Sequence, residues 1–301
     1  MKRLVFLFVS MLLILGLMLS CSDDSPTNAT LKPGDTTSAD FQFVQDVVGN
    51  GIIDEIPVSI NLSFDLLGDQ FAEASPKERA NTMALLDDDN VILMDSASYS
   101  YSSGWHIFRY FVTMVDTSNN DTVAVNGTDS IQIKANGTPL QVLDTTVNEL
   151  DLRNHFVYNS ITDTGSGNGY HALDIAGDLN GTGLLIINGS AIDSLQGTFS
   201  DSSASCNLHV NTNMTVNDVN INNGSDCPSS GNISITANMA LACAGQGDSS
   251  LDSLNINGGW TVTATFLGSQ VKYTYSNATT TWSATETCSE TVGKVTYKVG
   301  F

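Results

Sequence analysis

Cysteine is the residue type whose number and placement point most directly to chemistry in this sequence. Four of the five cysteines lie in the last third of the chain, at Cys206, Cys227, Cys243 and Cys288. An even number confined to one segment is typical of two disulfides in an exported protein. Three pairings are open, and proximity along the chain favours Cys206 with Cys227 and Cys243 with Cys288. Zinc is a weaker interpretation, because there is no C-x-x-C pair and only His209 lies nearby.

Two segments carry oxygen ligands at alternate positions, as a calcium loop does. They are residues 174–180 (DIAGDLN) and residues 218–222 (DVNIN). Both lack the terminal bidentate acid that completes such a loop. We therefore interpret them as polar faces of strands and hairpin turns and assign no metal ligand, with calcium as the alternative.

The sequence contains no recognisable catalytic motif. The four histidines are scattered without an i, i+4 pair, and G-x-S-x-G, H-E-x-x-H and Gly-rich phosphate loops are missing. We expect no enzymatic activity and no cofactor, and we assign no ligand-binding residue. The three tryptophans, Trp105, Trp260 and Trp282, suggest either a sugar-stacking platform or core packing. Trp260 continues an apolar stripe, which favours core packing.

The first twenty-one residues have the organisation of an export signal. Lys2 and Arg3 precede an uncharged apolar run at residues 4–19, and Ser20-Cys21 follows. This segment resembles a bacterial lipoprotein signal peptide, in which the usual run is Leu, a small residue, Gly or Ala, then Cys. Ser20-Cys21 fits that pattern, whereas the two positions before it, Met18 and Leu19, depart from it.

The resemblance implies cleavage after residue 20 and lipidation of Cys21, which then attaches the protein to a membrane. Ser22 after the cysteine, by analogy with Gram-negative lipoproteins, favours the outer membrane over the inner one. Ordinary cleavage and an uncleaved anchor are the alternatives.

Composition limits the partners of the chain. Its formal charge is −21, and it becomes −23 once the segment that holds Lys2 and Arg3 is removed. So acidic a surface repels phosphate backbones, which argues against nucleic-acid binding.

The remaining 281 residues predict a tether and one domain. Residues 21–40 read as the lipidated cysteine followed by a disordered, Pro-containing tether. Residues 41–301 read as a single antiparallel β domain, with its disulfide-bearing part at residues 204–288. The run FQFVQDVV from Phe41 is compatible with a short strand or one amphipathic turn.

One helix is predicted near the start of this domain. Ser75 is a suitable N-cap, Pro76 suits the first helical position and Glu78 completes a capping box, so we expect a helix over about residues 76–86. Before it, alternating apolar residues at 60–66 predict a strand.

From Val91 onward the pattern is that of β-strands. Seven Asn-Gly dipeptides, which favour two-residue hairpin turns, begin at Asn126, Asn136, Asn168, Asn180, Asn188, Asn223 and Asn257. Apolar residues alternate with Ser, Thr and Asn in the stretches 206–216, 233–243, 260–266, 271–275 and 282–284. We predict an all-β fold, an antiparallel meander of some fifteen or more strands that forms a sandwich or a curled half-barrel.

These features support three functions. The first is a non-enzymatic binding or structural lipoprotein of the cell envelope that holds a hydrophobic ligand on the apolar face. The second is a carbohydrate-binding or adhesive surface module. The third is a small outer-membrane β-barrel, suggested by the alternating terminal segment that ends at Phe301.

Overall fold

The computed structural model describes residues 32–45, 48, 90–116, 121–162, 165–180, 184–200, 204–222, 228–245 and 256–287. The predicted lipidation residue Cys21, the predicted strand at 60–66, the predicted helix at 76–86 and Phe301 lie outside these residues. Among the described residues, no helix combines the length and the apolar character needed to cross a membrane.

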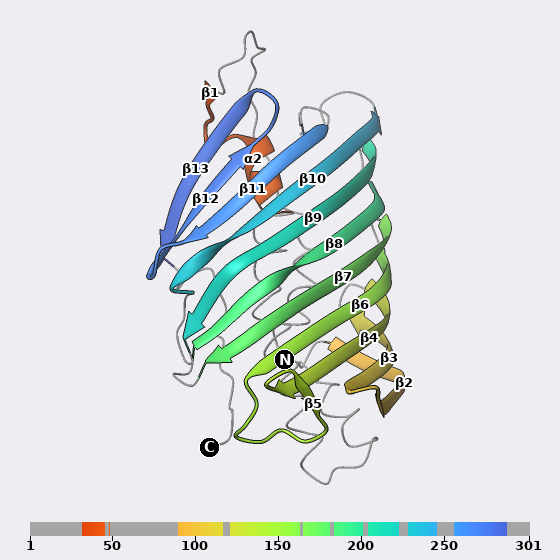
Figure 1. Cartoon of the computed structure of the whole chain (residues 1–301). Helices are drawn as coiled ribbons and strands as arrows, with labels where there is room; N and C mark the ends of the chain where they lie inside the picture. Colours follow the sequence, from red (N-terminus) through yellow and green to blue (C-terminus); the bar gives the residue numbers. More distant parts are fainter. Residues whose placement is uncertain are drawn as a thin grey trace.

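Thirteen strands form one sheet (Figure 1). In chain order they are β1 (Lys32–Pro33), β2 (Asn90–Ser102), β3 (Trp105–Asp116), β4 (Asp121–Ala135), β5 (Thr138–Leu140), β6 (Glu149–Thr162), β7 (Gly165–Asn180), β8 (Leu184–Ser200), β9 (Ala204–Asn222), β10 (Ser230–Gly245), β11 (Gly258–Phe266), β12 (Gln270–Ser276) and β13 (Thr280–Thr287). The order across the sheet is β1-β13-β12-β11-β10-β9-β8-β7-β6-β4-β3-β2, with β5 paired to β4 alone.

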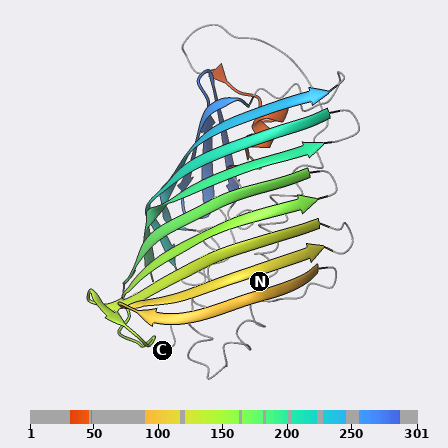
Figure 2. The ribbon, with the colours of Figure 1, turned by 90° about the vertical axis from the view of Figure 1, so that its right-hand side faces the viewer.

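The all-β prediction and the meander are confirmed, and of the two predicted shapes the sheet has the curled one. Consecutive strands pair antiparallel from β6 to β13, and only β1 runs parallel to its neighbour. Figure 2 shows this sheet bending as a single open layer. The strands are long, up to the 19 residues of β9, so a flat sheet would leave a large apolar surface in water.

Strict alternation explains the two faces of the sheet. Buried apolar residues come from every second position, as in β10, where Ile233, Ile235, Ala237, Met239 and Leu241 are buried and the intervening polar residues are not. The stripes predicted in the last third of the chain therefore share one face, which we call the inner face. Their registers bring Ile235 opposite Val262 and so join the stripes into one core.

A short helix covers one end of the inner face. Helix α2 (Ala39–Val44) begins at Ser38, whose Oγ accepts a hydrogen bond from the Phe41 amide at 3.4 Å. Its Phe41 ring packs edge-on against Tyr275 at 5.0 Å and stacks on Trp282 at 5.9 Å. The FQFVQDVV run therefore starts as an amphipathic turn, and α2 lies inside the curl beside β12 and β13 (Figures 1 and 2).

The predicted tether is too long, because its last residues belong to the fold. The amide of Lys32 donates to the Thr279 carbonyl at 3.1 Å, and that of Gly34 donates to the Thr281 carbonyl at 2.7 Å. The Trp282 indole also donates to the Asp35 carbonyl at 3.1 Å. Order therefore begins by Lys32, since the edge of β13 offers unpaired backbone groups that this segment satisfies.

Several Asn-Gly dipeptides are not turns, contrary to the prediction. Those at Asn126, Asn168 and Asn188 lie inside β4, β7 and β8. The dipeptide at Asn136 does form a hairpin turn, with φ of 50° at Asn136 and 77° at Gly137. The glycines inside these strands instead make room for neighbouring side chains and backbone. A glycine in a strand allows another group to come close where a Cβ atom would prevent it.

The favoured disulfide pairing is wrong for the described cysteines. Cys206 bonds to Cys243, with their Cα atoms 4.0 Å apart. The two residues lie directly opposite each other in the register of β9 and β10. Distance along the chain was the wrong criterion, because strand register decides which side chains meet. Cys227 and Cys288 lie outside the described residues.

Candidate functional site

A line of polar side chains crosses the apolar inner face. It consists of six residues on six neighbouring strands, and we call it the polar row: Tyr110 on β3, Asp129 on β4, Asn154 on β6, His171 on β7, Asp193 on β8 and Thr212 on β9. Four of them are buried to below 9% exposure, namely Asp129, Asn154, His171 and Thr212. Buried polar groups need hydrogen-bond partners. The hydrogen bonds of these side chains therefore bear on what the row does.

Asp129 is the centre of the first half of the row. It lies opposite Asn154 in the strand register, and its Oδ1 accepts a hydrogen bond from the Asn154 amide nitrogen. The Tyr110 hydroxyl donates to the same oxygen at 3.5 Å. The ring of Tyr110 lies over Gly127, where an added Cβ would come within 2.4 Å of the ring carbon Cζ. The mid-strand glycine thus lets Tyr110 lie along the sheet and reach Asp129.

Burial dominates the protonation of this group. It raises the pKa of Asp129 from its ordinary value of 3.8 to about 7, against the opposing effects of the bonds from Asn154 and Tyr110 and of the charge of His171. Burial, with the nearby Asp129 carboxylate, also raises the pKa of Tyr110 well above its ordinary value. Tyr110 therefore stays a neutral donor, whereas Asp129 changes its charge near neutral pH.

The second half of the row is a chain of hydrogen bonds across three strands. His171 Nδ1 lies 2.5 Å from Asp193 Oδ1, and the Thr212 hydroxyl donates to Asp193 Oδ2 at 3.1 Å. The strand registers bring these three residues side by side. The Phe156 ring packs on the imidazole, with 4.7 Å between centroids. Both oxygens of Asp193 are therefore used within the protein.

The first half of the polar row has fewer of its polar atoms hydrogen-bonded than the second half. Within the part of the chain that the structure describes, Asp129 Oδ2 and Asn154 Oδ1 are buried without a hydrogen-bond partner. Asn154 Oδ1 is an acceptor, and Asp129 Oδ2 is one while its carboxyl group is ionised. An unmet acceptor in an apolar surrounding costs about 1–3 kcal/mol, so these two oxygens mark a place suited to a hydrogen-bond donor.

Comparison with known proteins adds no assignment for this arrangement. No family model, curated protein or solved structure matches the chain. The chemistry of the polar row therefore has to be argued from its own atoms.

The predicted calcium segments are used by the sheet itself. Asp174 lies on the face of the sheet opposite the inner face, which we call the outer face. Its Oδ1 is 3.5 Å from Arg153 Nε and 3.4 Å from His155 Nε2. Asp218 sits in a bulge of β9 with φ of 45°, where its amide donates to Asn188 Oδ1 at 2.8 Å. Among the described residues, no group of three or more His, Cys, Asp or Glu side chains is placed to hold a metal ion.

The tryptophans are divided between the two faces. Trp260 and Trp282 are buried on the inner face and stack at 5.2 Å, so the two form part of the core. Trp105 is half-buried and carries Arg153 over its ring, with Cζ 4.4 Å from the centroid. The three do not form a common platform. Of the phenylalanines of β3, Phe108 is buried and Phe111 is 39% exposed.

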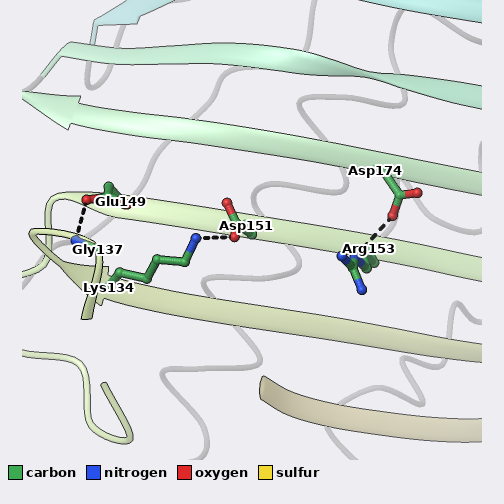
Figure 3. A network of polar contacts seen from close by, with 6 residues as sticks. All are labelled: Lys134, Gly137, Glu149, Asp151, Arg153 and Asp174. Carbon is green, nitrogen blue, oxygen red and sulfur yellow. Dashed lines mark hydrogen bonds and ion pairs between the residues drawn. The ribbon is translucent and has the colours of Figure 1, made fainter. Parts of the chain in front are cut away.

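The outer face carries a different kind of polar contact. Figure 3 shows Lys134 of β4 paired with Asp151 of β6, and Arg153 of β6 paired with Asp174 of β7. Glu149 accepts a hydrogen bond from the Gly137 amide at 2.7 Å and so holds the β4–β5 turn. These groups are partly or largely solvent-exposed, and surface pairs of this kind contribute little stability.

Sequence reasoning missed the polar row, although a local signal for it exists. Thr212 interrupts the apolar stripe between Val210 and Met214, and Asp129 interrupts the one between Val125 and Ile131. A single polar residue with the parity of a buried face is the pattern to look for. Its partners, in contrast, depend on the register of neighbouring strands.

Proposed function

We propose that this protein is a non-enzymatic lipoprotein of the cell envelope, attached to the outer membrane through Cys21, that holds a hydrophobic ligand along the inner face of its sheet. The observation that most supports this proposal is the single open sheet with one apolar face and one polar face. The apolar side chains of the inner face are buried from water, which is the environment that stabilises a hydrophobic ligand.

The distribution of side chains favours this function over a small membrane barrel. A membrane barrel turns its apolar positions outward to lipid. Here the apolar positions lie inside the curl, where α2 packs on Tyr275 and Trp282. On β10 the alternate positions on the opposite face are Ser, Asn and Thr from Ser230 to Asn238, followed by three alanines. That composition suits water.

The positions of the tryptophans favour hydrophobic-ligand binding over carbohydrate binding. Such a module needs exposed aromatic rings, and Trp260 and Trp282 are 2% and 6% exposed. Their stacking on each other and on α2 uses the faces that a sugar ring would need.

The position of β1 limits how far the sheet can lie from a lipid at Cys21. Lys32 is held on β13, and eleven residue steps separate it from Cys21. At no more than about 3.6 Å per residue, the β13 end of the sheet stays within roughly 40 Å of the membrane. A ligand could then pass between the membrane and the inner face over a short distance.

Binding of an uncharged apolar probe tests the proposal. The mature chain from residue 21 carrying Cys21→Ser has no acyl group of its own to compete with the probe. We expect it to bind N-phenylnaphthylamine saturably, with a blue-shifted emission because the probe leaves water.

The control replaces a core residue that faces the inner side. Ala237→Trp, in the middle of β10, should fill the inner face and reduce the number of probe sites, whereas Thr236→Trp on the outer face should not. Emission that remains unsaturated, or that is equal in folded and unfolded protein, would contradict the proposal.

A further inference from the structure

We propose that the outer face of the sheet carries a membrane-contact surface, which lies against the same phospholipid bilayer that holds the lipid at Cys21. This surface, which we call the outer patch, consists of five exposed apolar side chains: Phe111 on β3, Val157 and Ile161 on β6, Tyr170 on β7 and Ile192 on β8. The inference rests on the proposed attachment through Cys21 and adds a second, non-covalent contact with the membrane.

The exposed apolar residues of the protein are gathered at this place. Among the described residues, eight large hydrophobic side chains are exposed, and five of them belong to the outer patch. Val157 lies directly opposite Tyr170, and Phe111 is in the same cross-strand row two strands away. Ile192 lies in the next row, and Ile161 is four residues from Val157 on the same face. Single exposed apolar residues are ordinary, whereas a cluster of them is typical of a contact surface.

The outer patch has a sharp boundary after β8. On β9 the outer positions from Ser205 to Asn217 are Ser, Asn, His and Thr throughout. The outer positions of β11 between Trp260 and Phe266 are all Thr. These strands show that the outer face forms the sheet equally well with polar side chains. Folding alone therefore does not account for the apolar residues on β3, β6, β7 and β8.

The charge around the outer patch suits a lipid surface. The chain has 32 Asp and Glu residues, yet the four outer-face rows from Arg109 to Val115 carry none on β3, β4, β6, β7 and β8. Arg109 is exposed and forms no ion pair with another described residue. In the row beside it, Asp174 is engaged by Arg153. A free guanidinium beside aromatic and aliphatic side chains can bind a lipid phosphate while its neighbours enter the bilayer interface.

The size and shape of the outer patch favour a bilayer over a second copy of this chain. At exposures of 39% to 64%, the five side chains present roughly 450 Å² in all, whereas a stable interface between proteins buries about 800 Å² on each partner. The outer face is also the convex side of the curl (Figure 2), so a rigid copy would touch it only along a narrow strip. A fluid bilayer admits protruding side chains one by one and does not need a matching surface.

The N-terminal segment is long enough for both contacts. β7 lies six places from β13 in the sheet, which is about 29 Å at about 4.8 Å per strand. The chain between Cys21 and Lys32 spans up to roughly 40 Å, so a lipid at Cys21 and the outer patch can reach one membrane. Once the lipid is inserted, the second contact is intramolecular, so a weak affinity of the outer patch is sufficient.

Binding to vesicles tests the inference. The mature Cys21→Ser chain, which has no acyl group, is mixed with vesicles of phosphatidylethanolamine and phosphatidylglycerol and separated by flotation. We expect the chain to float with the vesicles. Phe111→Ser and Tyr170→Ser should each lower the partition coefficient roughly ten-fold, because each ring removes about 60 Å² of apolar surface from water.

A charge variant and a matched control separate the outer patch from the rest of the surface. Arg109→Gln should lower the partition coefficient roughly five-fold on these vesicles and leave it unchanged on phosphatidylcholine vesicles. Leu267→Ser removes a side chain that is 57% exposed between β11 and β12, outside the outer patch, and should float like the parent chain. N-phenylnaphthylamine should bind all four variants equally, since it reports on the inner face and on folding.

The outcomes are distinguishable. A parent chain that binds N-phenylnaphthylamine but does not float, or flotation that Phe111→Ser and Tyr170→Ser leave intact, would overturn the membrane contact and leave the proposed function standing. An oligomer in sedimentation that Phe111→Ser converts to a monomer would overturn it as well, because the outer patch would then join two copies. Flotation that depends on the outer patch, without N-phenylnaphthylamine binding, would support the membrane contact and overturn ligand binding on the inner face.

Discussion

At the scale of single residues, Asp129 is the most informative position in the molecule. A carboxyl group surrounded by apolar residues, with one oxygen bonded and the other unpartnered among the described residues, is destabilised in its charged form. Its pKa of about 7 in the folded protein exceeds its ordinary value of 3.8, so between these values the folded state binds the proton and the unfolded state does not. Folding stability therefore falls as the pH rises through this range.

We predict that Asp129→Asn removes this pH dependence. The amide is neutral at every pH, so the variant should be more stable than the wild type at pH 8 and lose that advantage near pH 4. The difference between the two pH values should be on the order of a few kcal/mol. Thermal unfolding of both proteins at pH 4, 6 and 8 measures it.

The comparison with the variant is needed because other acids also titrate between pH 4 and 8. Asp174→Asn, on the outer face, should follow the wild-type curve. A constant difference in melting temperature between wild type and Asp129→Asn would show that Asp129 keeps an ordinary pKa.

At the scale of elements, the glycines inside β7 and β8 decide how closely the strands and their side chains pack. Gly169 lies under the Tyr158 ring, where an added Cβ would be 2.3 Å from Cζ. Gly189 lies against backbone, with its added Cβ 2.3 Å from the Asp174 carbonyl oxygen and 2.7 Å from Ile175 Cα. A side chain can rotate away, but the backbone of a paired strand cannot, so Gly189 is the more restrictive position.

We predict that Gly189→Ala destabilises the protein by about 1–3 kcal/mol, because β7 and β8 must separate locally to admit the methyl group. Denaturation in urea measures this as a lower midpoint with an unchanged slope.

The matched control is Gly259→Ala in β11, where nothing lies within 4 Å of the added Cβ. It should be neutral or slightly stabilising, since alanine restricts the unfolded chain. Equal losses in the two variants would mean that glycine is needed for its flexibility and not for close approach.

At the scale of the whole molecule, the N-terminal segment and the sheet are connected through β1. The parallel pairing of Lys32 and Pro33 with β13, together with the bond from Trp282 to Asp35, attaches the N-terminal segment to one edge of the sheet. The same edge carries α2, so a lipid at Cys21 would hold this end of the molecule near the membrane.

We predict that Cys21 is the acylated residue. Cells grown with an alkyne analogue of palmitate should label the wild-type chain, and Cys21→Ser should lose the label because no other thiol stands in that sequence context. Cys227→Ser serves as the control, since it removes a different cysteine and should keep the label. A labelled Cys21→Ser chain, or an unlabelled wild type, would contradict the lipoprotein interpretation.

The sequence by itself determined the two faces of the sheet and the class of the fold. Alternation from Cys206 to Val216 and from Ile233 to Cys243 specifies which side of each strand is buried, because side chains in a strand have a period of two. The same local rule identified the hairpin at Asn136, whose Asn and Gly adopt positive φ.

Only the tertiary structure decided which of these residues meet. Cys206 pairs with Cys243, Asp129 with Asn154 and His171 with Asp193 because the registers of their strands place them opposite each other. Register depends on the packing of the entire face, and a shift of one residue would exchange the inner and outer faces. The polar row is therefore a product of strand pairing, and the local pattern shows only single members of it, such as Asp129 and Thr212.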